Sequence, residues 1–215
     1  MAAVTIAAAA PSAAGEAPLP LVAALREAVA AARARPVPVL ASALERELWR
    51  RTAVDRAARE ALLAGLAATP ADTRDAVSAA LWAEVRPIDR DNSDYLRSVM
   101  PARGWFSARE HGRFVPGWAW LIVQHSRDPA LRREVLARIE PLWMRGEIPG
   151  SRYALLHDRV ALEGGRPQRY GMQIVCRDGR AVPAAVENPA GLDRRRAALG
   201  LDPIGAYIAE ARMVC

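Results

Sequence analysis

The helical spacing of apolar residues constrains this chain more than any other feature. Between Leu19 and Ala34, the residues Leu21, Val22, Leu25 and Val29 recur at three- and four-residue steps, which is typical of one face of an α-helix. The same periodicity predicts further helices over residues 39–68, 73–85, 89–99, 117–126, 129–143 and 152–159. Prolines and glycines punctuate these stretches, and no heptad pattern lasts long enough to predict a coiled coil.

The pattern changes after residue 160. Short apolar runs at 160–162, 168–175 and 180–186 predict three strands, the last of them after the Asp178-Gly179 turn. Two final helices are predicted over 192–199 and 202–213. The predicted fold class is therefore α+β but mainly α, a helical domain with one small antiparallel β-sheet in the C-terminal half.

The domain organisation follows from composition. Residues 1–18 are rich in alanine and proline and predict a disordered tail, whereas residues 19–215 predict a single domain. The tail lacks the basic start of a secretory signal, so we expect a cytoplasmic protein and keep export as a minor alternative. Two distant cysteines, Cys176 and Cys215, make neither a disulfide framework nor a zinc site, which favours a reducing compartment. No run of about 18 apolar residues predicts a membrane span.

The basic residues exclude some chemistry. All 30 are arginine, so a lysine Schiff base and a Walker-type phosphate lysine are both excluded. The formal net charge is +6, but the arginines are dispersed among carboxylates, and the longest basic run is Arg194-Arg195-Arg196. We therefore interpret most arginines as solvated side chains on helix faces, and nucleic acid is a disfavoured partner.

Polar residues within the apolar second half are the candidate site. Gln124 and His125 end an apolar helix, and Asp158 and Arg159 follow on a later one. Because buried polar groups need partners, these side chains either line a pocket or tie helices together. Gln168, Tyr170 and Gln173 lie on one short predicted strand, and such side chains suit hydrogen bonding to a polar ligand.

Other groups of residues are weaker candidates for a functional site. Asp89, Asp91, Asn92 and Asp94 lack the glycine and distal glutamate of a calcium loop, and we interpret them as a helix cap with solvated charges. The three histidines have no ligand-like spacing, so no metal site is predicted. No motif for a cofactor or a Gly-x-Ser-x-Gly nucleophile is present, so we predict no cofactor.

Taken in order, the motifs resemble a bacterial family, the domain of unknown function numbered 6624. The resemblance covers about residues 45–210 and departs from the family pattern at Phe106, Ser126-Arg127, Met172 and Asn188. The residues that carry it are Asp89 to Asn92, Gly104-Trp105, Trp118 to His125, Asp158 to Val160, Gln168 to Gln173, Val186 to Asn188 and Asp193 to Leu201. The resemblance does not imply any particular reaction.

Two functions remain open at this stage. The first is a cofactor-independent hydrolase or group-transfer enzyme acting on a small polar or anionic ligand. His125 would be the general acid or base, Asp158 would orient it, and Arg159 would hold an anionic group. Gln124, Gln168, Tyr170 and Gln173 would line the pocket and bind the substrate. The second is a non-catalytic module that binds a ligand or a protein partner, in which the same residues form a closed structural network.

Overall fold

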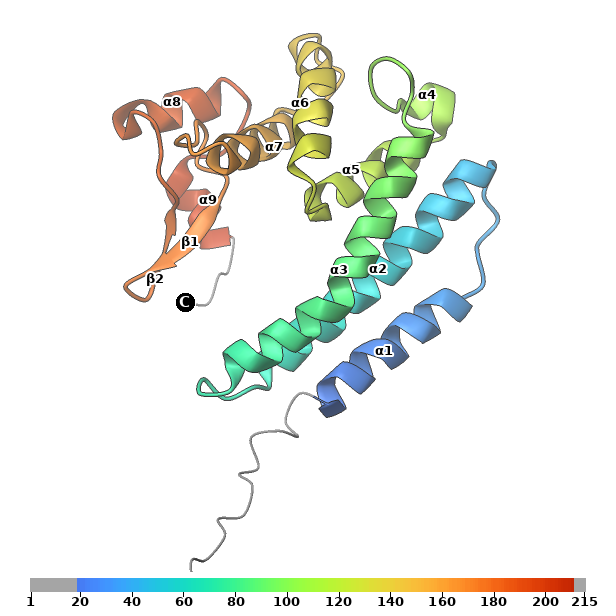
Figure 1. Cartoon of the computed structure of the whole chain (residues 1–215). Helices are drawn as coiled ribbons and strands as arrows, with labels where there is room; N and C mark the ends of the chain where they lie inside the picture. The colour runs from blue at the N-terminus through green and yellow to red at the C-terminus, as the bar shows by residue number, and fades with distance from the viewer. Residues whose placement is uncertain (1–18, 211–215) are drawn as a thin grey trace, which may run out of the picture. The chain divides into compact units, whose positions relative to one another are not determined.

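A computed structural model describes residues 19–210 of the chain (Figure 1). Two compact units emerge, one ending at Asp89 and the other beginning at Arg90, and each is considered by itself. The predicted tail, residues 1–18, lies outside the described residues, as do the last residues of the predicted terminal helix. The extent of the predicted domain, 19 to 215, stays a prediction.

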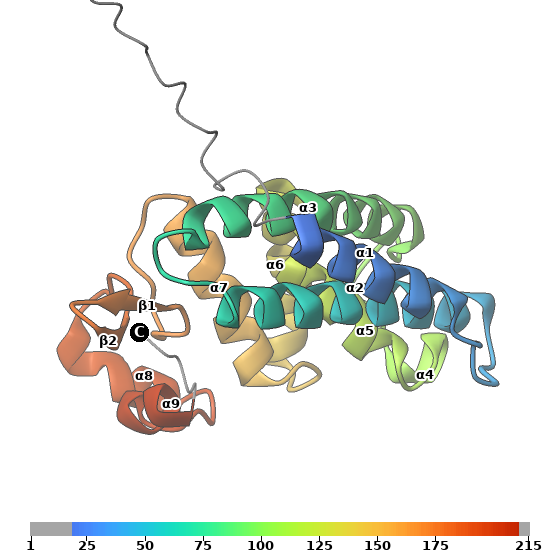
Figure 2. The same cartoon turned by 90° about the horizontal axis from the view of Figure 1, so that it is seen from below.

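The first unit is built on three helices, α1 (Leu19–Ala34), α2 (Ala43–Ala67) and the first part of α3 (Arg74–Val99). Figure 2 shows the three running side by side. Ser42 starts α2 with a capping box, in which its hydroxyl accepts the Glu45 N–H at 3.0 Å and Glu45 accepts the Ser42 N–H. The apolar stripes predicted from the sequence meet in one core, which comprises Leu25, Val29, Val54, Ala58, Leu62, Val77, Leu81 and Val85.

Helix α3 corrects two predictions. The sequence predicts separate helices over 73–85 and 89–99, but α3 is continuous through Pro87, because the buried positions Val85, Asp89 and Leu96 keep one helical period. The cluster at 89–94 therefore lies inside a helix and does not cap one. Asp89 is buried and not solvated, and its carboxylate accepts a hydrogen bond from Arg59 of α2.

The second unit continues with α4 (Ala108–His111), α5 (Val115–His125), α6 (Pro129–Met144) and α7 (Gly150–Glu163). Asp128 caps α6, since its carboxylate accepts the N–H groups of Ala130 and Leu131 at 2.8 and 3.1 Å. Helix α5 is less enclosed than its apolar sequence predicts. Val115, Ala119, Trp120, Ile122 and Val123 are buried, whereas its other residues keep partial exposure.

The C-terminal segment holds the one sheet found among the described residues. Strands β1 (Ile174–Arg177) and β2 (Arg180–Pro183) pair antiparallel across the Asp178-Gly179 turn, which confirms the predicted small sheet. A short 3-10 helix (Pro189–Gly191), α8 (Leu192–Ala197) and α9 (Ile204–Glu210) follow. The strand predicted at 160–162 is wrong, since these residues belong to α7. Most of the strand predicted at 168–175 is an irregular loop, in which Gln168 forms an isolated bridge with Val186.

One further observation bears on the sequence predictions. Among residues 19–210, no helix combines the length and the apolar character needed to cross a membrane.

Candidate functional site

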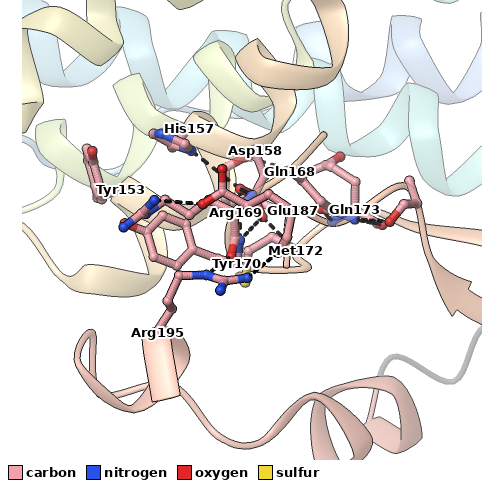
Figure 3. A network of polar contacts seen from close by, with 12 residues as sticks. Tyr153, His157, Asp158, Gln168, Arg169, Tyr170, Met172, Gln173, Glu187 and Arg195 are labelled. Carbon is pink, nitrogen blue, oxygen red and sulfur yellow. Dashed lines mark hydrogen bonds and ion pairs between the residues drawn. The ribbon is translucent and has the colours of Figure 1, made fainter. Parts of the chain in front are cut away.

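Asp158 is the centre of the polar cluster. It lies on α7, its exposed fraction is 0%, and its carboxylate faces the loop that follows the helix (Figure 3). The backbone N–H groups of Arg169, Tyr170 and Met172 donate to it at 2.7, 3.0 and 2.9 Å. Both carboxylate oxygens are therefore engaged, and hydrogen bonds to a charged acceptor are the stronger kind.

Gly171 lets the loop wrap this carboxylate. Its φ of +68° lies in the left-handed region, and an added Cβ would lie 3.0 Å from Ile204 and 3.4 Å from Leu192. Glycine adopts this backbone conformation without steric cost. The conformation brings the N–H groups of Arg169, Tyr170 and Met172, which lie on either side of Gly171, to the same side chain.

Gln168 closes the loop on itself. Its exposed fraction is also 0%, its Nε2 donates to the carbonyls of Gln173 and Ala184 at 3.0 and 2.9 Å, and its Oε1 accepts the Gln173 N–H at 2.9 Å. The backbone completes this arrangement, because the Gln168 N–H donates to Ala185 and its carbonyl accepts from Glu187. All the polar atoms of the Gln168 side chain thus have a partner within the protein.

Arg159 links α7 to two other segments. Its guanidinium donates to the Gln124 carbonyl at 2.6 Å and to Gln173 Oε1 at 3.3 Å. Gln173 in turn donates to the Leu155 carbonyl at 3.3 Å. The side chains of Arg159 and Gln173 therefore join the end of α5, helix α7 and the loop before β1, and Gln124 takes part through its backbone carbonyl.

Two arginines of α8 extend the cluster. Arg195 donates to the carbonyls of Arg169, Glu187 and Asn188 at 2.8, 2.6 and 3.2 Å. Figure 3 shows its side chain reaching from α8 toward the loop. Arg196, 1% exposed, donates to the carbonyls of Tyr170 and Asp202, both at 2.6 Å. Burial lowers the pKa of Arg196.

Aromatic rings cover one side of the cluster. The His157 ring centroid lies 5.6 Å from that of Tyr153 and 5.4 Å from that of Tyr170, and Trp143 stacks on Tyr153 at 4.4 Å. Burial raises the pKa of both tyrosines, and for Tyr153 a hydrogen bond from its hydroxyl to Glu140 adds to the effect. Both phenols therefore stay protonated near neutral pH.

The sequence profile of a family of unknown function, DUF6624, matches residues 42–213. The chain belongs to this family. No curated protein and no solved structure matches the chain.

The motifs that carried the DUF6624 resemblance fall largely in the cluster just described. Asp158, Gln168 and Arg196 are buried and bonded to backbone groups. Asp193 accepts the Ile204 N–H at 2.8 Å and thereby holds the start of α9. The sulfur of Met172 accepts a hydrogen bond from Arg196 at 3.5 Å. These motif residues hold the C-terminal segment on α7.

Six of the seven predicted DUF6624 site residues meet in this cluster. They are Gln124, Asp158, Arg159, Gln168, Tyr170 and Gln173. His125 follows Gln124 at the end of α5 and is half-buried. The histidine beside Asp158 is His157, whose Nδ1 lies 3.4 Å from Asp158 Oδ1. The catalytic roles expected of His125 and Asp158 stay predictions.

The arginine run at 194–196 is an exception to the interpretation of most arginines as solvated side chains. Arg194 is exposed, but Arg196 is buried and not solvated. Helical spacing was the available signal, because Leu192 and Arg196, four residues apart, lie on the same buried face of α8. Within residues 19–210, no group of three or more His, Cys, Asp or Glu side chains is arranged to hold a metal ion.

Proposed function

We propose that this DUF6624 domain acts by binding, and that its polar motif residues are the framework of the domain. The observation that carries the proposal is the state of Asp158. Its two oxygens are fully buried and already accept three backbone N–H groups. A carboxylate in this state orders the loop around it and has no oxygen to spare for a substrate.

The same argument extends to the neighbours of Asp158. Gln168 is satisfied by backbone groups, and Arg159, Arg195 and Arg196 donate mainly to carbonyls. Gln124 is the exception, because its side-chain Nε2 is buried and has no hydrogen-bond partner among the described residues. A network in which the other polar groups are satisfied specifies one arrangement of the chain, whereas a ligand pocket needs convergent polar groups that a ligand can reach. The partner of the domain, a protein or a small ligand, would then bind at another surface.

The proposal is tested by thermal unfolding with and without a panel of metabolites. The proteins compared are the wild type, His125→Ala and Asp158→Asn. We expect Asp158→Asn to lower Tm strongly and His125→Ala to lower it slightly. A ligand at about a hundred times its Kd raises the free energy of unfolding by ~2.7 kcal/mol. Because the proposed function is binding, we expect the protein to leave such a ligand chemically unchanged. Turnover of a ligand that is lost in a folded His125→Ala variant would overturn the proposal.

A second candidate function is cofactor-independent hydrolysis or group transfer with a histidine acid or base. The observation that favours it is the His157–Asp158 pair, because the His157 side chain keeps 24% exposure beside a buried carboxylate. Orientation of an imidazole by a carboxylate is a recurring feature of general acid–base catalysis. His157→Ala and His125→Ala, assayed side by side on any substrate found, identify which histidine is used.

A cytoplasmic location also stays a proposal.

A further inference from the structure

The beginning of α5 carries aromatic side chains that the core does not enclose. Phe114, the residue before α5, is 44% exposed. Its ring stacks on Trp118 with centroids 5.2 Å apart and planes 26° apart, and the Arg113 guanidinium lies 5.1 Å from the Phe114 centroid. Helices α4 and α5 are drawn in green and lime in Figure 1.

These residues belong to a stripe along one helix face. Phe114, Trp118 and Leu121 are spaced i, i+4 and i+7, and all three keep exposure, whereas Val115, Ala119 and Ile122 on the other side are buried. The buried side supplies the core contacts of α5. The other side therefore leaves the Phe114 ring exposed and Trp118 and Leu121 partly exposed, and contiguous apolar surface often marks an interaction site.

The charge around the stripe indicates the chemistry of its partner. Arg103, Arg109 and Arg113 are all exposed, and Glu110 is the only carboxylate between residues 100 and 121. Glu110 is itself engaged, because its carboxylate accepts the Ser107 hydroxyl at 3.0 Å. This segment of the chain is therefore positively charged, and the Arg113 guanidinium lies beside the exposed Phe114 ring. Tryptophan, tyrosine and arginine are the residues most enriched at interface hot spots.

We propose that the stripe, defined as Arg113, Phe114, Trp118 and Leu121, binds an acidic amphipathic helix of a partner protein. The proposal rests on the proposed function and adds the surface and the class of partner. A helix with apolar residues at i, i+3, i+4 and i+7 matches the spacing of the stripe, and its carboxylates would face Arg113, whose guanidinium lies beside the Phe114 ring. A nucleic acid fits less well, because Phe114 already stacks with Trp118 and Arg113.

The test is fluorescence anisotropy with a labelled peptide of about 18 residues, which forms five helical turns. The peptide carries leucine at i, i+3, i+4 and i+7 and glutamate elsewhere. The test variants are Arg113→Glu, Phe114→Ala and Trp118→Ala. The matched controls are Arg133→Glu and Met144→Ala, since both residues are exposed on α6. Circular dichroism and Tm verify that each variant is folded.

We expect each test variant to raise Kd by at least ~10-fold and each control to raise it by less than about 2-fold. A peptide with glutamine in place of glutamate should bind at least ~10-fold more weakly. Binding that survives all three test variants would overturn this surface and leave the proposed function intact. No binding by the wild type at about 100 μM peptide, or tighter binding of an oligothymidine through the same residues, would overturn the acidic helix.

Discussion

At the scale of single residues, Asp158 holds the loop at 169–172 in place. Asp158→Asn keeps the shape of the side chain but replaces one acceptor oxygen with an amide group that meets backbone N–H donors. Because buried donors without an acceptor cost free energy, we expect the free energy of unfolding to fall by about 3 kcal/mol. Urea denaturation monitored by circular dichroism measures the change.

The matched control at the edge of the same cluster is Glu187→Gln. Glu187 accepts from Arg169 at 2.6 Å, but both side chains are well exposed. Exposed ion pairs contribute little, so we expect a loss below about 1 kcal/mol. Equal losses in the two variants would contradict the framework role of Asp158.

The chemistry of this cluster was visible in the sequence, but its partners were not. Gln168, Tyr170 and Asp158 were singled out as polar residues in an apolar half, and they do lie together. Their partners, however, are backbone N–H and carbonyl groups of a loop, and every residue type offers those groups. Side-chain identity therefore predicts that Asp158 needs donors, while only the fold shows which ones it has.

At the scale of elements, Pro87 tests the continuity of α3. Proline inside a helix removes one backbone hydrogen bond and crowds the preceding turn, at a cost of about 3 kcal/mol. Pro87 is exposed, so Pro87→Ala adds no packing conflict. We expect this variant to raise the free energy of unfolding by about 1–3 kcal/mol.

Thermal unfolding of Pro87→Ala by circular dichroism measures this gain, with Ala83→Pro as the reverse change one turn earlier. Ala83 is also exposed on α3, so the reverse variant should lose about the same amount. A Pro87→Ala variant that is less stable than the wild type would contradict a helix that runs on through this position.

The cap of α6 predicts a pH dependence. A hydrogen bond from Arg97 and the N–H groups of Leu131 and Ala130 lower the pKa of Asp128. Because the pKa of Asp128 is lower in the folded state, its charge stabilises the fold fully above the pKa of an unfolded aspartate, about 3.9. This stabilisation is lost as the pH falls through the pKa of Asp128 in the folded protein. Asp128→Asn keeps a good capping residue without the charge.

We therefore expect the wild type to exceed Asp128→Asn in stability at pH 5–7 and the difference to vanish near pH 2. The difference should stay below about 1 kcal/mol, because Asp128 and Arg97 are over one third exposed and solvent screens the pair. Chemical denaturation across this pH range measures it. Asp72→Asn, at an exposed position, is the control, and a difference that grows in acid would contradict the cap.

The elements that the sequence misplaced have a common physical cause. Val160-Ala161-Leu162 is a short apolar run, and such a run fits a strand or the end of a helix equally well. It belongs to α7, which continues to Glu163 before Gly164. Residues 168–173 belong to a predicted strand, yet hydrogen bonds to the side chains of Asp158 and Gln168 replace those of a sheet. The periodicity of apolar residues indicates local secondary structure, and it does not predict hydrogen bonds between residues far apart in the sequence.

At the scale of the whole molecule, we expect a substitution in one compact unit to destabilise the contacts of that unit and not those of the other. Leu62→Ala opens a cavity in the core of the first unit, where Leu62 is buried, and such substitutions cost about 2–5 kcal/mol. Asp158→Asn removes the acceptor that orders residues 169–172.

Hydrogen exchange by mass spectrometry distinguishes the two losses, because local opening exposes only the amides of the affected element. We expect Leu62→Ala to accelerate exchange in α1, α2 and residues 74–89, and Asp158→Asn to accelerate it from Gln168 to α9. If Asp158→Asn left residues 168–210 as protected as in the wild type, the motif residues would have no framework role. The proposal that the domain acts by binding would then lose the observation that carries it.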